Sequence, residues 1–210
     1  MAHKSGTAIH PGHFGAWPAR CVQALAQLST TRLNLRAGLM ADTLTGLGLL
    51  AAGVAHGAIS VDGVALTVAA GLLLFSFIEY AVHRWLFHGH TGPFARGHAR
   101  HHARPLGHDA LPFFLPPLFW CALAWLLARA LAPAYALLLA GVMAAGYAAY
   151  GISHVLVHVA HFKSTWLQRW VALHEVHHRH PKTNFGVTTG LLWDVVLHTG
   201  RSAQPGHSVH

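Results

Sequence analysis

Four long apolar runs constrain the fold of this chain more than any other feature of the sequence. They cover residues 38–59, 64–78, 110–131 and 135–159, and the second run continues through residues 79–88. A helix needs about 20 apolar residues to cross the hydrocarbon of a bilayer. Hydrophobic residues make up 53% of the chain and charged residues only 10%, well below the roughly 25% of soluble domains. We therefore expect an all-α, polytopic membrane protein of about four transmembrane helices.

The basic residues indicate how these helices are oriented. The chain has 14 Lys and Arg residues against 6 acidic ones, and most of the basic residues lie before residue 37, in the segment 89–110 and after residue 160. An even number of spans places both termini and the segment 89–110 on one side of the membrane. Because cytoplasmic segments carry an excess of Lys and Arg, we expect that side to be cytoplasmic. The basic residues flank the apolar runs and form no run of their own, so we expect no binding to nucleic acid.

The ends of the chain differ from its centre. We interpret residues 1–37 as a tail followed by an amphipathic helix over residues 17–36, with Pro18 in its first turn. Such a helix either lies on the membrane surface or simply caps the fold. Residues 38–200 are predicted to form a single membrane domain with a histidine-rich cytosolic cap, and residues 201–210 a C-terminal tail.

Histidine is the most unusual component of the sequence, with 21 residues. Ten of them repeat one pattern, in which a pair at the end of an apolar run is followed by a triplet of the form H-x-x-H-H. On a helix, positions i, i+3 and i+4 lie on one face, so each triplet can direct three imidazoles to one point. The ten residues are His83, His88, His98, His101 and His102 in the first half, and His154, His158, His174, His177 and His178 in the second.

This pattern favours a site that holds two metal ions. Neutral imidazole is the commonest protein ligand for transition metals, and ten histidines exceed the roughly four ligands of a structural zinc site. The two ions could divide the histidines by sequence halves, or the halves could interleave. His83 and His88, five residues apart, diverge by about 140° on a straight α-helix. We therefore expect the helix to end near Gly89, which would let His88 turn inward.

Four acidic residues lie near the histidines in the sequence. Metal-bound histidines usually donate their second N–H to a carboxylate or a carbonyl, so these acids are candidates to orient the ligands. For Asp109 and Glu175, the alternative is a surface ion pair with a nearby arginine. The four candidates are Glu79, Asp109, Glu175 and Asp194.

The order and spacing of the four histidine groups resemble the fatty acid hydroxylase superfamily, the integral-membrane non-haem di-iron enzymes that include sphingolipid fatty acid 2-hydroxylases, sterol C4-methyl oxidases and sterol desaturases. The similarity covers roughly residues 75–200, and the segment 184–194 also resembles the one that follows the last triplet in the 2-hydroxylases. The matching strings are Glu79-Tyr80-x-x-His83-Arg84-x-x-Phe87-His88, His98-x-x-His101-His102-x-x-Pro105, His154-x3-His158 and His174-x-x-His177-His178.

The resemblance implies a function as well as a fold. The ten histidines would hold two iron ions, which zinc could replace in purified protein, and O2 would be the co-substrate. The substrate would be a fatty acyl or sphingolipid-type lipid that enters from the bilayer and is hydroxylated at a C–H bond. Since the sequence contains no cytochrome b5 domain, electrons would come from a separate electron-transfer protein.

Other functions compete with this one. Within the same chemistry, the alternatives are a carotenoid ring hydroxylase and a sterol-type oxidase or desaturase. A histidine-rich metal transporter or metal-binding membrane protein is an alternative of another class, but a translocation path needs ligands spread through the membrane, and here they gather at one face. A haem protein with two axial histidines would leave the triplets unexplained.

Overall fold

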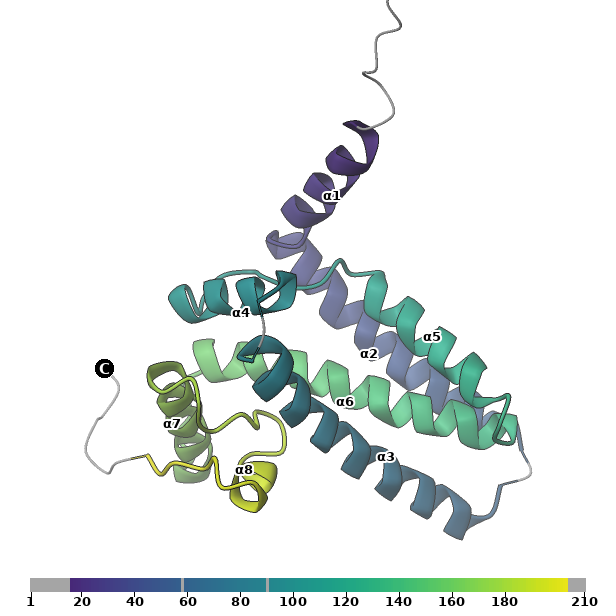
Figure 1. The fold of residues 1–210 in the computed structure, drawn as a ribbon. Coiled ribbons are helices and arrows are strands. Elements are labelled where there is room, and N and C mark those ends of the chain that lie inside the picture. The colour runs from purple at the N-terminus through teal and green to yellow at the C-terminus, as the bar shows by residue number, and fades with distance from the viewer. Residues whose placement is uncertain (1–15, 58, 90, 204–210) are drawn as a thin grey trace, which may run out of the picture.

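The structure, a computed structural model, describes residues 16–57, 59–89 and 91–203. Within these ranges all regular secondary structure is helical and there is no strand, which confirms the predicted all-α class. The helices are α1 Ala16–Leu28, α2 Arg32–Ala55, α3 Val61–Ala81, the π-helix Val82–Phe87, α4 Pro93–Ala103, α5 Leu115–Leu127, α6 Pro133–Val159, α7 Thr165–Arg179 and α8 Leu192–Val196 (Figure 1).

Three helices are long and apolar enough to cross a membrane, namely α2, α6, and α3 together with the π-helix that continues it. The third apolar run gives only the 13 residues of α5, about 20 Å of helix against the roughly 30 Å of hydrocarbon. Pro112 precedes this helix, and Pro116 and Pro117 occupy its first turn, where a proline costs little. The polytopic membrane architecture therefore consists of three long helices and one shorter apolar helix.

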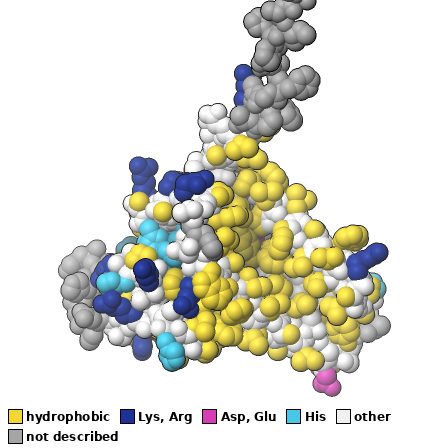
Figure 2. All heavy atoms as spheres, viewed as in Figure 1, with side chains coloured by type: hydrophobic (Ala, Val, Ile, Leu, Met, Phe, Trp, Pro, Cys, Tyr) yellow, Lys and Arg dark blue, Asp and Glu magenta, His cyan; other side chains and the backbone are white. Residues whose placement is uncertain are grey.

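Helix α6 lies at the centre of the bundle and packs against α2, α3 and α5. The closest approach is between α2 and α6, where a Cβ atom added to Gly46 would lie 2.9 Å from the Cα atom of Ala145. Small residues let membrane helices approach closely in this way. Hydrophobic side chains cover most of the visible surface of the bundle, while most Lys and Arg side chains gather at the end where α4 and α7 lie (Figure 2).

The N-terminal region differs from its prediction. The single helix expected over residues 17–36 is divided, because α1 ends at Leu28 and α2 begins at Arg32. The Oγ1 atom of Thr31 accepts a hydrogen bond from the Asn34 amide at 3.1 Å and caps α2. The last residues of the predicted helix, 32–36, therefore belong to the first long helix, α2. Residues 1–15, and residues 204–210 of the predicted C-terminal tail 201–210, lie outside the described residues.

Helices α4 and α7, which carry the two histidine triplets, lie against the ends of α3 and α6 (Figure 1). The last turn of the α3 segment is a π-helix, which hydrogen-bonds from residue i to i+5 and so contains one more residue per turn than an α-helix. His83 and His88 are five residues apart, and their ring centroids lie 5.3 Å from each other. The helix does end at Phe87, but it is the widened turn that brings both histidines to one face.

Candidate metal centre

All ten predicted histidines converge beside the ends of α3 and α6, where they form two groups of five. Within each group, the potential ligand nitrogens lie within 4.8 Å of one another. Group A consists of His83, His88, His98, His102 and His177, and group B of His101, His154, His158, His174 and His178. The two sequence halves therefore interleave, since His101 joins the second half and His177 joins the first.

Helix geometry explains this exchange. On an α-helix, residue i+4 is rotated by about 40° from residue i and residue i+3 by about 60° in the opposite direction, so residues i+3 and i+4 are about 100° apart around the axis. On α4, His98 and His102 face group A and His101 faces group B. On α7, His174 and His178 face group B and His177 faces group A. Each of these helices consequently lies between the groups and contributes to both.

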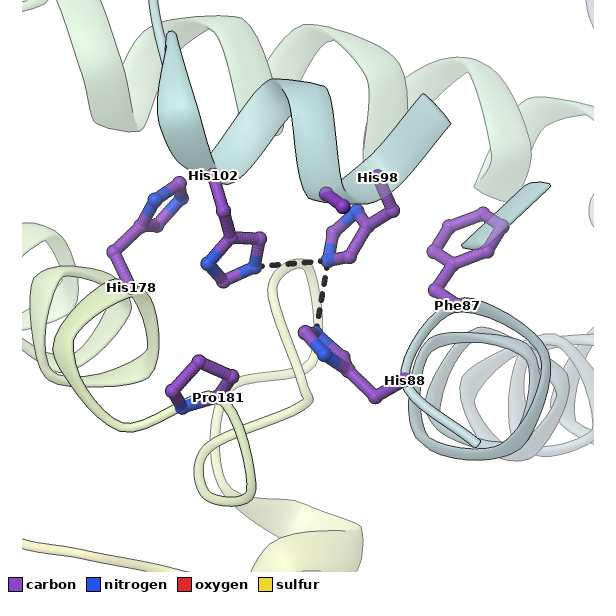
Figure 3. A pocket seen from close by; sticks show the side chains of 7 residues that line it. Phe87, His88, His98, His102, His178 and Pro181 are labelled. Atoms are coloured by element: carbon purple, nitrogen blue, oxygen red, sulfur yellow. Dashed lines mark hydrogen bonds between the residues drawn. The ribbon is translucent and has the colours of Figure 1, made fainter. Parts of the chain in front are cut away.

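In group A, the Nε2 atoms point toward a common centre. The Nε2 atom of His98 lies 3.0 Å from that of His83, 2.9 Å from that of His88 and 3.0 Å from that of His102. The Nε2 atom of His177 completes the group at 3.2 Å from His88 and 3.1 Å from His102. Figure 3 shows His98 between His88 and His102, with the ring of Phe87 stacked beside it.

Group B has the same arrangement. The Nε2 atom of His158 lies 3.2 Å from that of His101 and 3.0 Å from that of His174. The Nε2 atom of His178 lies 3.2 Å from both His101 and His174. The fifth ring, that of His154, lies 4.4 Å from the ring of His101, and its buried Nε2 atom has no hydrogen-bond partner within the described parts of the chain.

Two backbone carbonyls identify the tautomers of two rings of group A, those of His83 and His177. The Nδ1 atom of His83 lies 2.6 Å from the Phe185 carbonyl oxygen, and that of His177 lies 2.8 Å from the Thr183 carbonyl oxygen. A carbonyl can only accept a hydrogen bond, so in each neutral ring Nδ1 carries the hydrogen and Nε2 has a free lone pair. Lone pairs that converge repel one another unless a cation lies among them. This donor set therefore fits a transition-metal ion such as iron, copper or zinc.

Burial keeps these histidines neutral, the form that binds metal. It lowers the pKa of His88 to about 4, and that of both His101 and His177 to about 3, from an ordinary value of 6.5. The neighbouring imidazoles lower these pKa values further, because a second positive charge nearby is unfavourable. At neutral pH, the rings outside the membrane helices are thus ready to act as ligands.

None of the four candidate acids hydrogen-bonds to a histidine among the described residues. Asp109 instead pairs with Arg100 at 2.9 Å and Glu175 with Arg179 at 3.0 Å, so both form the alternative surface ion pair. Glu79 and Asp194 are buried and accept hydrogen bonds from the backbone amides of residues 185–188. The acceptors that orient His83 and His177 are carbonyl oxygens, which the sequence could not identify because every residue carries one.

Two cavities open onto the histidines. The first, of about 260 Å³, is lined by Phe87, His88, His98, Ala99, His102, His178 and Pro181 (Figure 3). The second, of about 340 Å³, is lined by His102, Pro105, His158, Glu175, His178 and Arg179. Since both cavities include histidines of group A and of group B, a small molecule in either would reach both groups.

Comparisons with known proteins show which family of sequences this chain resembles. The sequence model of the family described as fatty acid hydroxylase matches residues 68–199. The chain is 32% identical over 144 residues to a dihydroceramide fatty acyl 2-hydroxylase of Arabidopsis thaliana, covering 63% of this chain and 59% of that protein. It is 31% identical over 149 residues to the fatty acid 2-hydroxylase of Rattus norvegicus, covering 61% of this chain and 38% of the relative. The matches thus span less than two thirds of these relatives.

A solved structure supports the fold. The hydroxylase domain visible in full-length Scs7p superimposes with a TM-score of 0.64 at 22% sequence identity, covering 88% of this chain and 72% of that one. At this identity the likeness concerns the arrangement of the helices. It extends beyond the segment matched by the family model, because it covers a larger share of the chain.

Proposed function

This chain belongs to the fatty acid hydroxylase family, and we propose that it is a membrane-bound non-haem di-iron oxygenase that hydroxylates a C–H bond of a lipid. The observation that carries the proposal is the pair of five-histidine groups, whose nitrogens converge beside the ends of apolar helices. A metal transporter would need ligands along a path through the membrane. Here all ten candidate ligands gather at one end of the bundle.

The proposed substrate is a fatty acyl or sphingolipid-type lipid that reaches the site from the bilayer. The relatives are named as dihydroceramide fatty acyl and fatty acid 2-hydroxylases, which makes carbon 2 of an acyl chain the first position to examine. Leu66 and Leu72 of α3 are exposed on the apolar bundle, where lipid would surround them. An apolar substrate could therefore approach the histidines without crossing water.

The residues of the chain have defined roles in this reaction. When bound, two iron ions supply the reduction of O2 and the cleavage of an unreactive C–H bond. One oxygen atom enters the lipid and the other leaves as water, which requires two electrons and two protons from outside the substrate. The two histidine groups would hold one ion each, and the carbonyls of Thr183 and Phe185 fix the tautomers of His177 and His83 that such an ion needs.

The electrons would come from a separate redox protein. Arg104, Arg179 and Lys182 are exposed next to the two cavities, so this surface is suited to an acidic partner. By the positive-inside rule, we place this surface, with both termini, on the cytoplasmic side. We also propose that residues 38–200 form the catalytic membrane domain, with residues 1–37 and 201–210 as its flanking segments.

The test is lipid mass spectrometry of cells that express the chain. We expect one class of acyl lipids to gain the mass of one oxygen atom, and the gain to vanish in His101→Ala and His177→Ala. The matched control is Asp109→Asn, which changes an acid that contacts only Arg100 among the described side chains. Loss of two hydrogen atoms would indicate a desaturase instead. Purified protein that binds no iron or zinc would refute the proposed metal centre.

A further inference from the structure

The two histidine groups are held differently by the protein around them. In group A, two of the five rings donate Nδ1–H to backbone carbonyls, those of His83 and His177. In group B, the Nδ1 atoms of His174 and His178 are buried with no hydrogen-bond partner in the described ranges. We propose that Glu79 and Asp194 are positioning residues that fix group A through the segment 183–188, and that group A is consequently the tighter metal site. This inference rests on the proposed metal-binding function.

The two acids together hold four consecutive backbone amides. Glu79 comes from the end of α3 and Asp194 from α8, and both carboxylates accept hydrogen bonds from the segment 185–188. The Oε1 atom of Glu79 accepts hydrogen bonds from the backbone amides of Val187 at 2.7 Å and Thr188 at 2.8 Å. The Oδ1 atom of Asp194 accepts one from the amide of Phe185 at 3.0 Å, and its Oδ2 atom accepts one from the amide of Gly186 at 2.9 Å. The path of this segment is therefore set by charge-assisted hydrogen bonds.

The same segment presents the two carbonyls to group A. Thr183 and Phe185 flank Asn184, which has a φ of 53°, a left-handed conformation that asparagine tolerates better than most residues. The Asn184 side chain donates to the carbonyls of Leu173 at 3.1 Å and Arg201 at 2.9 Å, and thereby ties the segment to α7. A shift of the segment would move both carbonyls, and with them the rings of His83 and His177.

The buried carboxylate of Asp194 has further support. Its Oδ1 atom accepts from the Thr199 hydroxyl at 2.6 Å, so that hydroxyl must receive the hydrogen of the Tyr80 hydroxyl at 3.0 Å. Tyr80 in turn accepts from Arg84 at 2.7 Å. This chain of donors leads from the positively charged Arg84 to Asp194, which is 0% exposed. An ionised carboxylate in such a place is costly without donors, and here it has three.

Group B lacks this arrangement. An acceptor for Nδ1–H orients a metal-bound histidine and makes it a better ligand, and its removal typically weakens metal binding by about 10–100-fold. In group A, only His102 has a buried Nδ1 atom without a partner within the described residues, and two rings are anchored. In group B, His174 and His178 both have a buried Nδ1 atom without a partner, and no ring of the group donates to a backbone carbonyl within the described residues.

Single-site backgrounds allow each group to be measured alone in the full chain. His154→Ala removes a ligand of group B, so the zinc that remains reports on group A, and His98→Ala does the reverse. Zinc affinity is measured on purified protein in detergent by competition with a chelator. We expect the His154→Ala protein to bind its zinc more tightly than the His98→Ala protein does.

Asp194→Asn is then introduced into both backgrounds. The asparagine amide would place an NH2 group against a backbone N–H, so the segment 185–188 would lose one of its anchors. We expect zinc affinity to fall by about 10–100-fold in the group A background and to stay the same in the group B background. Glu79→Gln should have a smaller effect, because its amide oxygen can still accept both hydrogen bonds that Oε1 accepts.

The controls separate positioning from folding. Asp109→Asn should leave zinc affinity unchanged in both backgrounds, and each variant is checked by its unfolding midpoint and by size exclusion. If Asp194→Asn does not fold, Glu79→Ala carries the test, because it removes both hydrogen bonds that Oε1 accepts and should weaken zinc binding in the group A background alone. Equal losses in both backgrounds, or no loss in either, would overturn the positioning role while leaving the metal centre intact. Absence of zinc from the unsubstituted protein would instead overturn the proposed function.

Discussion

Two double substitutions in the histidine groups should lower the metal content to different extents. His98 and His101 lie three residues apart on α4 but belong to different groups, whereas His98 and His177 are 79 positions apart in sequence and belong to the same group. We expect His98→Ala with His177→Ala to leave about one metal ion per chain. We expect His98→Ala with His101→Ala to leave almost none, because each site then lacks one ligand.

The structure gives the size of the effect. The Nε2 atom of His177 lies 3.2 Å from that of His88 and 3.1 Å from that of His102, so it belongs to the ligand cluster itself. Loss of a residue that only orients a ligand weakens binding by about 10–100-fold. Loss of the ligand itself should cost at least the upper end of that range, about 2.7 kcal/mol for each site. A moderate chelator would then strip the damaged site and leave the intact one.

Metal content is measured by elemental analysis after gel filtration in that chelator. Alanine is the best helix former, so α4 and α7 should persist in both proteins. If the ions followed the sequence halves, the result would be reversed, because His98 and His101 would share one site and His98 and His177 would not. That reversal, or equal metal content in the two proteins, would refute the interleaved assignment.

Two further predictions concern stability. Gly46→Ala would place a Cβ atom 2.8 Å from the backbone nitrogen of Ala145 and should lower the free energy of unfolding by about 1–3 kcal/mol, which would be measured as a lower unfolding midpoint in detergent. The control is Gly48→Ala, whose added Cβ atom would have nothing within 4 Å and should not lower the midpoint. In metal-stripped protein, the folded-state pKa values of His88, about 4, and His177, about 3, lie below the ordinary 6.5, so the unfolded chain binds more protons in acid. Stability should therefore fall as the pH drops from about 6.5 toward 3, and an unfolding midpoint that rises on acidification would contradict this.

Much of the bundle could be predicted because its causes are local in sequence. Long apolar runs with few charges require helices in a membrane, and three of the four runs form helices of spanning length. The fourth run contains only the shorter α5, since its beginning is rich in proline and residues 128–131 follow as turns and a bend. The spacing of H-x-x-H-H also predicted correctly that the triplets lie on helices, but the expectation that each triplet directs three imidazoles to one point was wrong, because each triplet divides two to one between the groups.

The wide turn at the end of α3 could not be predicted from the sequence. The six residues 82–87 contain neither glycine nor proline that would mark an irregular helix. The turn is associated with a distant contact, the hydrogen bond between His83 and the carbonyl of Phe185, 102 residues later. Contacts of this kind depend on the tertiary fold and leave no pattern in the neighbouring sequence.

The division of the ligands was also beyond the sequence, for a geometric reason. The two halves of the chain repeat the same pattern, which makes a division by halves look natural. On a helix that lies between two sites, however, the second and third histidines of H-x-x-H-H are about 100° apart around the axis, so the third can share a site with the first while the second faces the other site. Both triplets obey this rule, so His101 and His177 exchange groups.

This exchange links the stability of the metal centre to that of the cap formed by α4 and α7. Neither α4 nor α7 can complete a site with the helix that precedes it, because each contributes two ligands to one group and one to the other. Both helices are short, and α7 has an exposed Trp166 near its start, so apolar burial alone holds them weakly. Metal-binding free energy is folding free energy wherever the site is absent from the unfolded chain. Two ions bound across the interleaved groups would therefore join α3, α4, α6 and α7, and their removal should loosen the cap before it affects the close-packed contact between α2 and α6.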